Sequence, residues 1–269
     1  MRANLGRAAD HFGMTVTGEP TFGWRLRSIG ARVDGPNGPR WLRVVSEFPE
    51  WAHGDTWTGN TDANTLTGIT RPVVQGTHEW GEGGWRRQRA EVTTLLPGRT
   101  CSDTDVLRNE LKLPDAWWRQ LRRTVDTLRV TPTSRVNTDP ERLDVRLREE
   151  YRGRAHLRVQ DWETVHGDLH WNNLLQPRFA LLDWELWGRG PAGTDPATLY
   201  CYSLLAPATA ARVHETFADQ LDTPAGQIAQ LVVATRLLDR AGDGDHPDLI
   251  EPLRHHVDVL AANAVLGPA

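Results

Sequence analysis

The hydrophobic period of this chain changes at PGRTCSD, residues 97–103, and this change limits the fold more than any other feature. Before it, FGWRLRSIGARV and RWLRVVSE alternate apolar and polar residues, a pattern that predicts strands buried on one face. After it, apolar residues recur at helical spacing, as at Trp117 and Leu121. We therefore predict a chain of the α+β class, in which a small β-rich part, residues 1–96, precedes a mainly helical part, residues 97–269.

Turn and capping residues give the expected elements approximate limits. DGPNG lies between two alternating runs and predicts a hairpin. A short helix is expected to start near Asp62 in the N-terminal part. In the C-terminal part we expect Asp115 to cap one helix and Thr194 or Asp195 to cap another, because such side chains accept hydrogen bonds from the first backbone N–H groups of a helix.

Charge and cysteine usage argue against several classes of function. The formal net charge of −4 argues against a protein that binds nucleic acid or an anionic membrane, whose surface would be basic. Cys101 and Cys201 lie far apart and form no CxxC pair, which favours a reducing compartment, and we expect a cytoplasmic location. No run approaches the roughly 18 consecutive apolar residues of a membrane span, so we expect no membrane partner.

The stretch TVHGDLHWNNLL, residues 164–175, places several hydrogen-bonding side chains between apolar runs, and NNLLQPRFALLDWE then predicts a short hairpin. Asn173 lies five residues after Asp168 and ten before Asp183, so this hairpin would bring Asn173 and Asp183 together at its open end. One amide oxygen and one carboxylate suit Mg²⁺, which prefers oxygen ligands. Asp168 lies just outside that pair, where it can orient an attacking hydroxyl and accept its proton. These residues therefore fit phosphoryl transfer.

HGDLHWNNLL followed by LLDWE resembles the catalytic loop and metal-binding strand of the aminoglycoside phosphotransferase and choline kinase family of small-molecule kinases. The resemblance implies a bilobal protein-kinase-like fold, with a nucleotide-binding N-lobe (1–96) and a C-lobe (97–269) that carries the catalytic loop and the metal site. It also implies ATP and Mg²⁺ as cofactors and a hydroxyl of a small molecule, such as an aminoglycoside or another metabolite, as acceptor. Asp168 then falls on the catalytic position, and Asn173 and Asp183 fall on the metal-binding positions.

The same resemblance implies nucleotide-binding residues in the N-lobe. Arg43, in RWLRVV, matches the basic residue that holds the nucleotide phosphates, with an arginine fork in place of a lysine. The backbone of Thr94 and Leu96, in TTLLPG, matches the segment that faces the adenine base. Glu47 and Glu50 are candidates, on position alone, for the helix glutamate that pairs with the basic residue in such kinases.

Other residues near the motif have supporting or substrate-binding roles in this interpretation. His166 is expected to hold the loop through backbone hydrogen bonds, and Asp195 matches a position that supports the catalytic loop. The possible substrate contacts are His170, Trp187 and Arg189. His170 can equally fill the loop.

Three alternatives stay open at this stage. The chain can be a non-catalytic nucleotide-binding relative, because its phosphate-covering turn GEPTFGW lacks the pattern GxGxxG. It can be a kinase that acts on a peptide or protein, although the short segment of twelve residues from Asp183 to Asp195 favours a small substrate. A metallophosphoesterase would need further His and Asp ligands at other strand ends. The sequence leaves the acceptor and the oligomeric state open.

Overall fold

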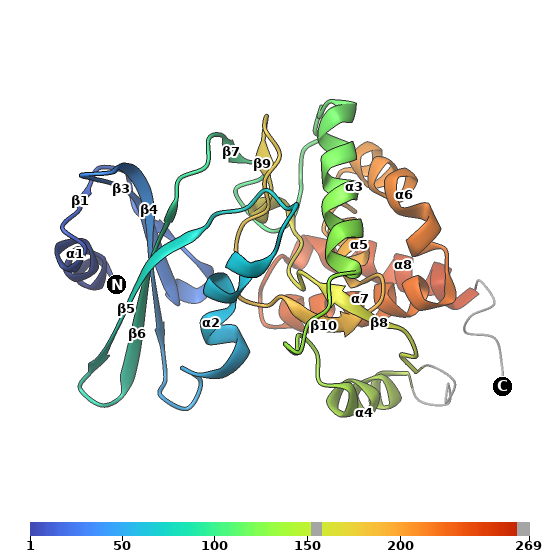
Figure 1. The fold of residues 1–269 in the computed structure, drawn as a ribbon. Coiled ribbons are helices and arrows are strands. Elements are labelled where there is room, and N and C mark those ends of the chain that lie inside the picture. Colours follow the sequence, from blue (N-terminus) through green and yellow to red (C-terminus); the bar gives the residue numbers. More distant parts are fainter. Residues whose placement is uncertain (152–157, 263–269) are drawn as a thin grey trace. The chain divides into compact units, whose positions relative to one another are not determined.

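The structure, a computed structural model, describes residues 1–151 and 158–262 of the chain (Figure 1). The chain forms two compact units. The first contains residues 1–67 and 71–97, and the second contains residues 68–70 together with the chain from Gly98 onward.

The first unit is built on an antiparallel sheet in the order β1-β3-β4-β6-β5, with β2 paired to β3. Its elements are α1 (Arg2–His11), β1 (Thr15–Val16), β2 (Thr21–Phe22), η1 (Trp24–Leu26), β3 (Ser28–Gly35), β4 (Gly38–Glu47), α2 (Gly54–Asp62), η2 (Ala63–Thr65), β5 (Val74–Glu82) and β6 (Arg86–Thr94).

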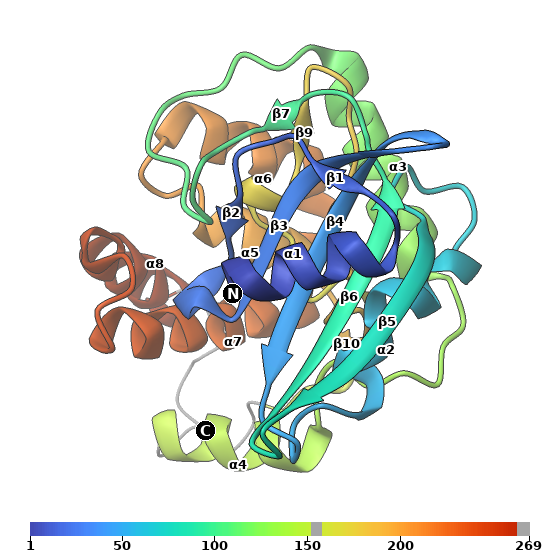
Figure 2. The ribbon, with the colours of Figure 1, turned by 90° about the vertical axis from the view of Figure 1, so that its left-hand side faces the viewer.

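The hairpin expected at DGPNG is present as β3 and β4, whose last paired residues are Gly35 and Gly38. Gly38 has a positive φ of 84°, a conformation that glycine adopts without steric cost. Helix α1 lies across one face of the sheet (Figure 2) and buries Leu5 against Ile29 and Leu42. The alternation seen in the sequence therefore corresponds to one face of the sheet packed under α1.

Helix α2 corrects the expected limits, because Asp62 is its last residue and not its start. The helix begins at Gly54, after His53 in an extended conformation. Trp57 is 7 % exposed, and its indole N–H donates to a Glu79 carboxylate oxygen at 3.0 Å. A buried tryptophan with a bonded indole thus fixes a helix whose sequence has weak helical periodicity.

The second unit is mainly helical. Its elements are β7 (Arg99–Thr100), α3 (Asp115–Arg129), α4 (Pro140–Glu150), β8 (Trp162–Val165), η3 (Trp171–Asn173), β9 (Leu175–Gln176), β10 (Gly188–Pro191), α5 (Thr194–Cys201), α6 (Pro207–Leu221), α7 (Pro224–Gly242), η4 (Pro247–Leu249) and α8 (Ile250–Ala262). Among the described residues, no helix has the length and apolar character needed to cross a membrane. The sheet-rich first unit and helical second unit confirm the α+β prediction.

Two predicted helix caps differ from the structure. Asp115 is the first residue of α3 and Pro114 holds the cap position, while the Asp115 side chain accepts from Arg212 at 2.7 Å. At α5 the cap position belongs to Gly193 with φ 86°, and Thr194 and Asp195 lie in the first turn. In both helices the carboxylate binds another part of the chain, which local capping preferences do not register.

Stacked aromatic side chains fix the segment that follows the HGD motif. Trp117 of α3 and Trp171 of η3 are both fully buried, and their ring centroids lie 6.4 Å apart in a stacked arrangement. The Trp117 indole also donates to the carbonyl oxygen of Leu175 at 2.8 Å. Trp117, one of the apolar residues at helical spacing in α3, thus packs against the segment that carries the candidate site.

Candidate active site

The predicted hairpin after the HGD motif is present in the second unit. The N–H of Leu175 donates to the carbonyl of Ala180 at 3.0 Å, and the N–H of Leu182 donates to the carbonyl of Asn173 at 2.8 Å. Asp183 therefore directly follows the residue that is paired with Asn173. The hairpin brings the two positions together at its open end, as the spacing indicated.

Asp168 presents a partly accessible carboxylate. Its side chain is 27 % exposed, and one carboxylate oxygen lies 3.2 Å from Nε2 of His170. Burial by itself raises the pKa of Asp168, but the combined attraction of His170, Arg236 and His166 and the hydrogen bond from His170 outweigh burial and hold the pKa below its usual range. Asp168 is therefore a carboxylate at neutral pH.

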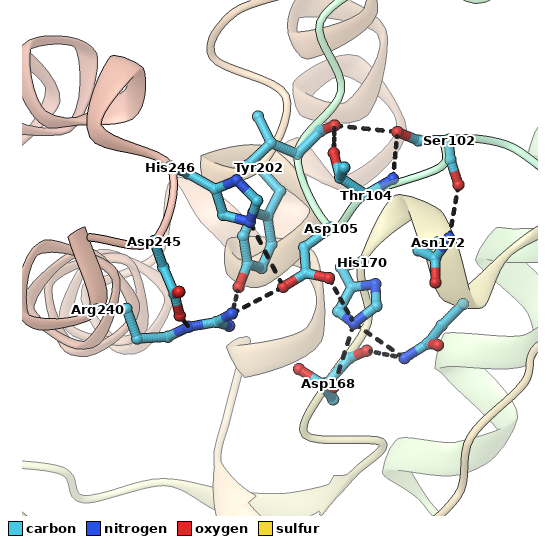
Figure 3. A network of polar contacts seen from close by, with 12 residues as sticks. Ser102, Thr104, Asp105, Asp168, His170, Asn172, Tyr202, Arg240, Asp245 and His246 are labelled. Carbon is cyan, nitrogen blue, oxygen red and sulfur yellow. Dashed lines mark hydrogen bonds and ion pairs between the residues drawn. The ribbon is translucent and has the colours of Figure 1, made fainter. Parts of the chain in front are cut away.

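His170 lies between two carboxylates and contacts Asp168 directly (Figure 3). Its Nε2 is 3.6 Å from Asp105, and its side chain is 8 % exposed. Burial lowers the pKa of His170, whereas Asp168, Asp105 and Asp183 raise it, and the net shift is upward. A largely buried ring in this position supports Asp168. Contact with substrate stays a prediction.

His166 links the HGD motif to the strand before Asp183. Its ring is fully buried, and burial lowers the pKa of His166 to about 4, so the ring is neutral. Nδ1 accepts from the Asp168 N–H at 3.3 Å, which leaves Nε2 protonated to donate to the carbonyl of Leu182 at 2.9 Å. The two bonds together assign the tautomer.

Asp195 accepts two backbone N–H groups of the motif. Its two carboxylate oxygens bind the N–H of His166 at 2.7 Å and the N–H of Gly167 at 2.9 Å. The residue is 2 % exposed, and burial raises the pKa of Asp195 to about 7 despite these two bonds. The first turn of α5 thus holds the loop that carries Asp168.

Gly167 stands where the loop is packed most tightly. Its φ is 81°, and a Cβ atom placed there would lie 2.0 Å from the Asn137 amide nitrogen. The same amide nitrogen donates to the carbonyl of Leu186 at 2.7 Å, in the segment after Asp183. Asn137 therefore packs the two segments together, and a glycine is required between them.

Asn173 and Asp183 provide the oxygen atoms of the candidate cation site. The Asn173 amide nitrogen donates to the carbonyl of Asp168 at 3.0 Å, so the amide oxygen is the atom that can bind a cation. Asp183 has a positive φ of 55°, which is uncommon for a residue with a side chain and is often found at functional sites. Within the described part of the chain, no group of three or more His, Cys, Asp or Glu side chains could hold a metal ion.

The segment after Asp183 contains the other possible substrate contacts. Trp187 is 4 % exposed, with the Arg135 guanidinium 4.7 Å above its ring. Arg189 is exposed and lies in β10, paired with Thr164 of β8. Trp187 is thus part of the packed interior, while Arg189 is accessible to solvent.

The nucleotide-binding candidates lie in the first unit. Arg43 is half-buried on β4, between the fully buried Leu42 and Val44. Thr94 ends β6; its N–H donates to the carbonyl of Val73 at 3.0 Å, and its carbonyl accepts from the Thr93 hydroxyl at 3.4 Å. Leu96 is half-buried in the segment that follows β6.

Glu91 is a buried carboxylate that the sequence interpretation missed. It is 2 % exposed and is the cross-strand partner of Arg43, so both side chains point to the same face of the sheet. Its carboxylate accepts from Asn60 of α2 at 2.9 Å and from Arg89 at 2.9 Å. Strand pairing between β4 and β6 would have indicated it.

Glu47 and Glu50 are not on a helix. Glu47 ends β4 and binds Arg27 at 2.8 Å, and Glu50 follows in an exposed turn. Helix α2 itself contains no glutamate. The helix glutamate that the family resemblance implied is therefore not on α2, and Glu91 on β6 is a buried acid beside Arg43.

A second set of polar residues extends from His170 and was also missed (Figure 3). The Asp105 carboxylate accepts from Arg240 at 3.0 Å, and the same guanidinium donates to the Tyr202 hydroxyl at 2.7 Å. Asp105 lies more than a hundred residues from Arg240 in the sequence, so no local pattern reveals the pair.

No protein-family model and no curated protein sequence matches this chain, whereas many solved structures do. Aminoglycoside phosphotransferase APH(4)-Ia aligns over 96% of this chain and 99% of its own length, with a TM-score of 0.65 and 13% identity. Amicoumacin kinase hAmiN, solved with AMP-PNP and Ca²⁺, aligns over 98% and 93%, with a TM-score of 0.63 and 13% identity. The chain has the fold of these small-molecule kinases.

A third solved structure with the same fold belongs to a kinase of a different antibiotic. Spectinomycin phosphotransferase APH(9)-Ia, in complex with ADP and spectinomycin, aligns over 94% of this chain and 93% of its own, with a TM-score of 0.54 and 8% identity. The predicted bilobal protein-kinase-like fold is confirmed.

Proposed function

We propose that this protein is an ATP- and Mg²⁺-dependent phosphotransferase that moves the γ-phosphoryl group to a hydroxyl of a small molecule. One observation carries the proposal. The Asn173 side-chain amide donates to the backbone carbonyl of Asp168, and the Asn173 backbone carbonyl accepts from the N–H of Leu182, so Asn173 ties the backbone at Asp168 to the residue before Asp183. An accessible carboxylate beside a pair of cation-binding oxygens is the minimum that phosphoryl transfer needs.

Asp168 is the proposed catalytic residue. Its lowered pKa makes it a weak base, so it orients the acceptor hydroxyl and accepts the proton as the bond to phosphorus forms, without removing the proton beforehand. His170 occupies one carboxylate oxygen of Asp168 and thereby limits its rotation. The remaining oxygen can bind the hydroxyl.

The donor set fits a hard divalent cation. Asn173 offers an amide oxygen and Asp183 a carboxylate, and Mg²⁺ takes one or two such protein ligands and completes its shell with water and phosphate oxygens. When bound, the cation would neutralise charge on the transferred phosphoryl group. His166 bonds the carbonyl of Leu182 and so keeps the residue preceding Asp183 in place.

The proposed nucleotide contacts are in the first unit. Arg43 would bind phosphate oxygens with its planar fork, which suits bidentate contacts. The Thr94 carbonyl and the backbone of Leu96 would bind the adenine base. Whether the nucleotide is ATP or GTP is decided by binding experiments with each.

A small acceptor is favoured by the packed segment that follows Asp183. The guanidinium of Arg135 donates to the carbonyl of Trp187 at 3.0 Å, and Asn137 donates to that of Leu186. The backbone of this segment is therefore already ordered in the protein without a modification. A peptide substrate would need a surface for an extended chain.

The test measures ADP production with ATP, Mg²⁺ and a panel of hydroxyl-bearing metabolites and antibiotics. Wild-type protein should turn over at least one acceptor, and Asp168→Asn should lose activity by about 10²-fold or more while it binds ATP with unchanged affinity. Asp258→Asn, on the exposed side of α8, is the matched control and should be fully active. ATP binding without turnover of any acceptor or peptide would instead support the non-catalytic alternative.

A further inference from the structure

Arg236 of α7 is a half-buried cation to which the proposed reaction assigns no role. Its Nη1 donates to the carbonyl oxygen of Gly167 at 3.2 Å. Its Nε and Nη2 are shielded from solvent and have no hydrogen-bond partner within the described part of the chain. Shielded donors without a partner cost free energy, so the hydrogen bonding of Arg236 alone does not explain its position.

The contact falls on the peptide group that joins Gly167 to Asp168. The carbonyl of this group accepts from Arg236, and its N–H donates to Nδ1 of His166 at 3.3 Å. Both ends of one peptide group are thus held by side chains. Because the N–Cα bond of Asp168 lies in this rigid plane, the plane fixes the bond from which the Asp168 side chain is built.

The neighbouring peptide groups are held as well. Asp195 accepts the N–H groups of His166 and Gly167, at 2.7 and 2.9 Å. The positive charge of Arg236 also acts on the Asp195 carboxyl: burial raises the pKa of Asp195, and Arg236 lowers it. Arg236 therefore affects both the geometry and the charge of the loop.

We propose that Arg236 is a positioning residue for Asp168. It fixes the Gly167–Asp168 peptide group through the Gly167 carbonyl, and its charge acts on the Asp195 carboxylate that holds the neighbouring peptide groups. The inference rests on the proposed phosphotransferase function. Since a small misplacement of a catalytic group can reduce a rate by about 10²-fold, a residue that touches no substrate can limit kcat.

The kinetic test compares Arg236→Met with Arg236→Lys. Methionine fills similar space without charge or donor, so kcat should fall roughly 10-fold to 10²-fold while KM for ATP and for the acceptor stays within about 3-fold. Lysine keeps the charge and one donor, so it should recover kcat to within about 5-fold of wild type. If Arg236→Met does not fold, Arg236→Gln replaces it, because its amide keeps a donor without the charge.

A second readout needs no turnover. Hydrogen exchange of the peptide that covers residues 164–171 should be faster in Arg236→Met than in wild type, because the loop loses a tether. The control is Arg122→Met. Arg122 binds Asp126 at 2.8 Å and Asp219 at 2.7 Å, so its loss costs ion pairs in the same unit without touching the loop. It should leave both kcat and exchange at residues 164–171 unchanged.

The outcomes separate the two claims. Unchanged kcat and unchanged exchange in Arg236→Met would overturn the positioning role, as would a rise in KM with kcat intact, which would mean that Arg236 contacts a substrate. Faster exchange in a protein that phosphorylates no acceptor would leave the loop contact standing and refute the proposed function.

Discussion

Asp195 and His166 are joined by a hydrogen bond of 2.7 Å, from the His166 backbone N–H to a carboxylate oxygen that is almost fully buried. The other carboxylate oxygen accepts the N–H of Gly167. One side chain in the first turn of α5 therefore satisfies two buried backbone donors of the loop that carries Asp168.

Asp195→Asn should destabilise the fold and slow the reaction. The amide oxygen can accept one of the two N–H groups, but the amide nitrogen then faces the other, which leaves a buried donor unpaired. We expect the free energy of unfolding to fall by about 2 kcal/mol, measured by chemical denaturation at pH 7. Thr194→Ser, a neighbour in the same turn, is the control. Equal stability of Asp195→Asn and wild type would show that the two hydrogen bonds contribute nothing.

The neutral ring of His166 should make stability depend on pH. Its folded pKa of about 4 lies below the unfolded value of 6.5, so the unfolded state binds more protons between these values. The stability that the ring contributes is fully present above pH 6.5 and is lost as pH falls toward 4. The difference in free energy of unfolding between wild type and His166→Asn should shrink by about 2 kcal/mol from pH 7 to pH 5.

The free energies of unfolding of wild type and His166→Asn must be subtracted, because Asp195 changes the stability of both proteins with pH in the opposite direction to His166. The pKa of Asp195 is raised to about 7, so its contribution falls as pH rises. The subtraction removes this common term. Val145→Ala, an exposed substitution that removes no titratable group, serves as control and should give no pH-dependent difference. A difference for His166→Asn that is constant from pH 7 to pH 5 would contradict a neutral buried ring.

How much of this site was predictable depends on distance along the chain. The hairpin, Asp168, Asn173 and Asp183 all lie within sixteen residues, where motif spacing and local periodicity carry the information. Arg236 contacts Gly167 from α7, almost seventy residues further along the chain. Its position in the middle of a helical run does not indicate that contact. The local sequence pattern therefore predicts the hairpin but does not reveal Arg236, which contacts the loop before it.

The limits of local pattern are also visible in the elements. The periodicity of α3 predicted its extent well, because its apolar residues are the ones buried. Helix α2 was misplaced because its stability comes from the bonds of Trp57 and Asn60 to Glu79 on β5 and to the buried Glu91 on β6. Glu91 was missed for the same reason, since only strand pairing shows that it lies beside Arg43.

Glu91→Gln should weaken ATP binding. Removal of this buried negative charge changes the electrostatic environment of Arg43, its cross-strand partner on the same face of the sheet, and we expect the Kd for ATP to rise by about 5-fold to 10-fold in calorimetry. Glu79→Gln is the matched control. Glu79 also binds Arg89, but its cross-strand partner on β6 is Arg89, which lies two residues from Glu91. Equal changes in both variants would assign the effect to the ion-pair network as a whole.

Asp183→Asn should raise the Mg²⁺ concentration needed for half-maximal activity. An amide keeps the oxygen but loses the charge, and a hard cation is bound more weakly by a neutral ligand. A titration at saturating ATP should show a shift of roughly 10-fold or more. Asp115→Asn is the control, since it makes the same chemical change in an exposed carboxylate of α3 that binds Arg212. An unchanged Mg²⁺ requirement in Asp183→Asn would remove Asp183 from the cation site.

The most direct measurement follows the phosphoryl group itself. ATP labelled at the γ-phosphate is incubated with Mg²⁺, an acceptor found in the screen and either wild-type protein or Asp168→Asn, and the acceptor is analysed by mass spectrometry. We expect the label to appear on an acceptor hydroxyl with wild type and transfer to fall by at least about 10²-fold with Asp168→Asn, although both proteins bind ATP equally. Equal transfer by the two proteins would contradict the proposed role of Asp168.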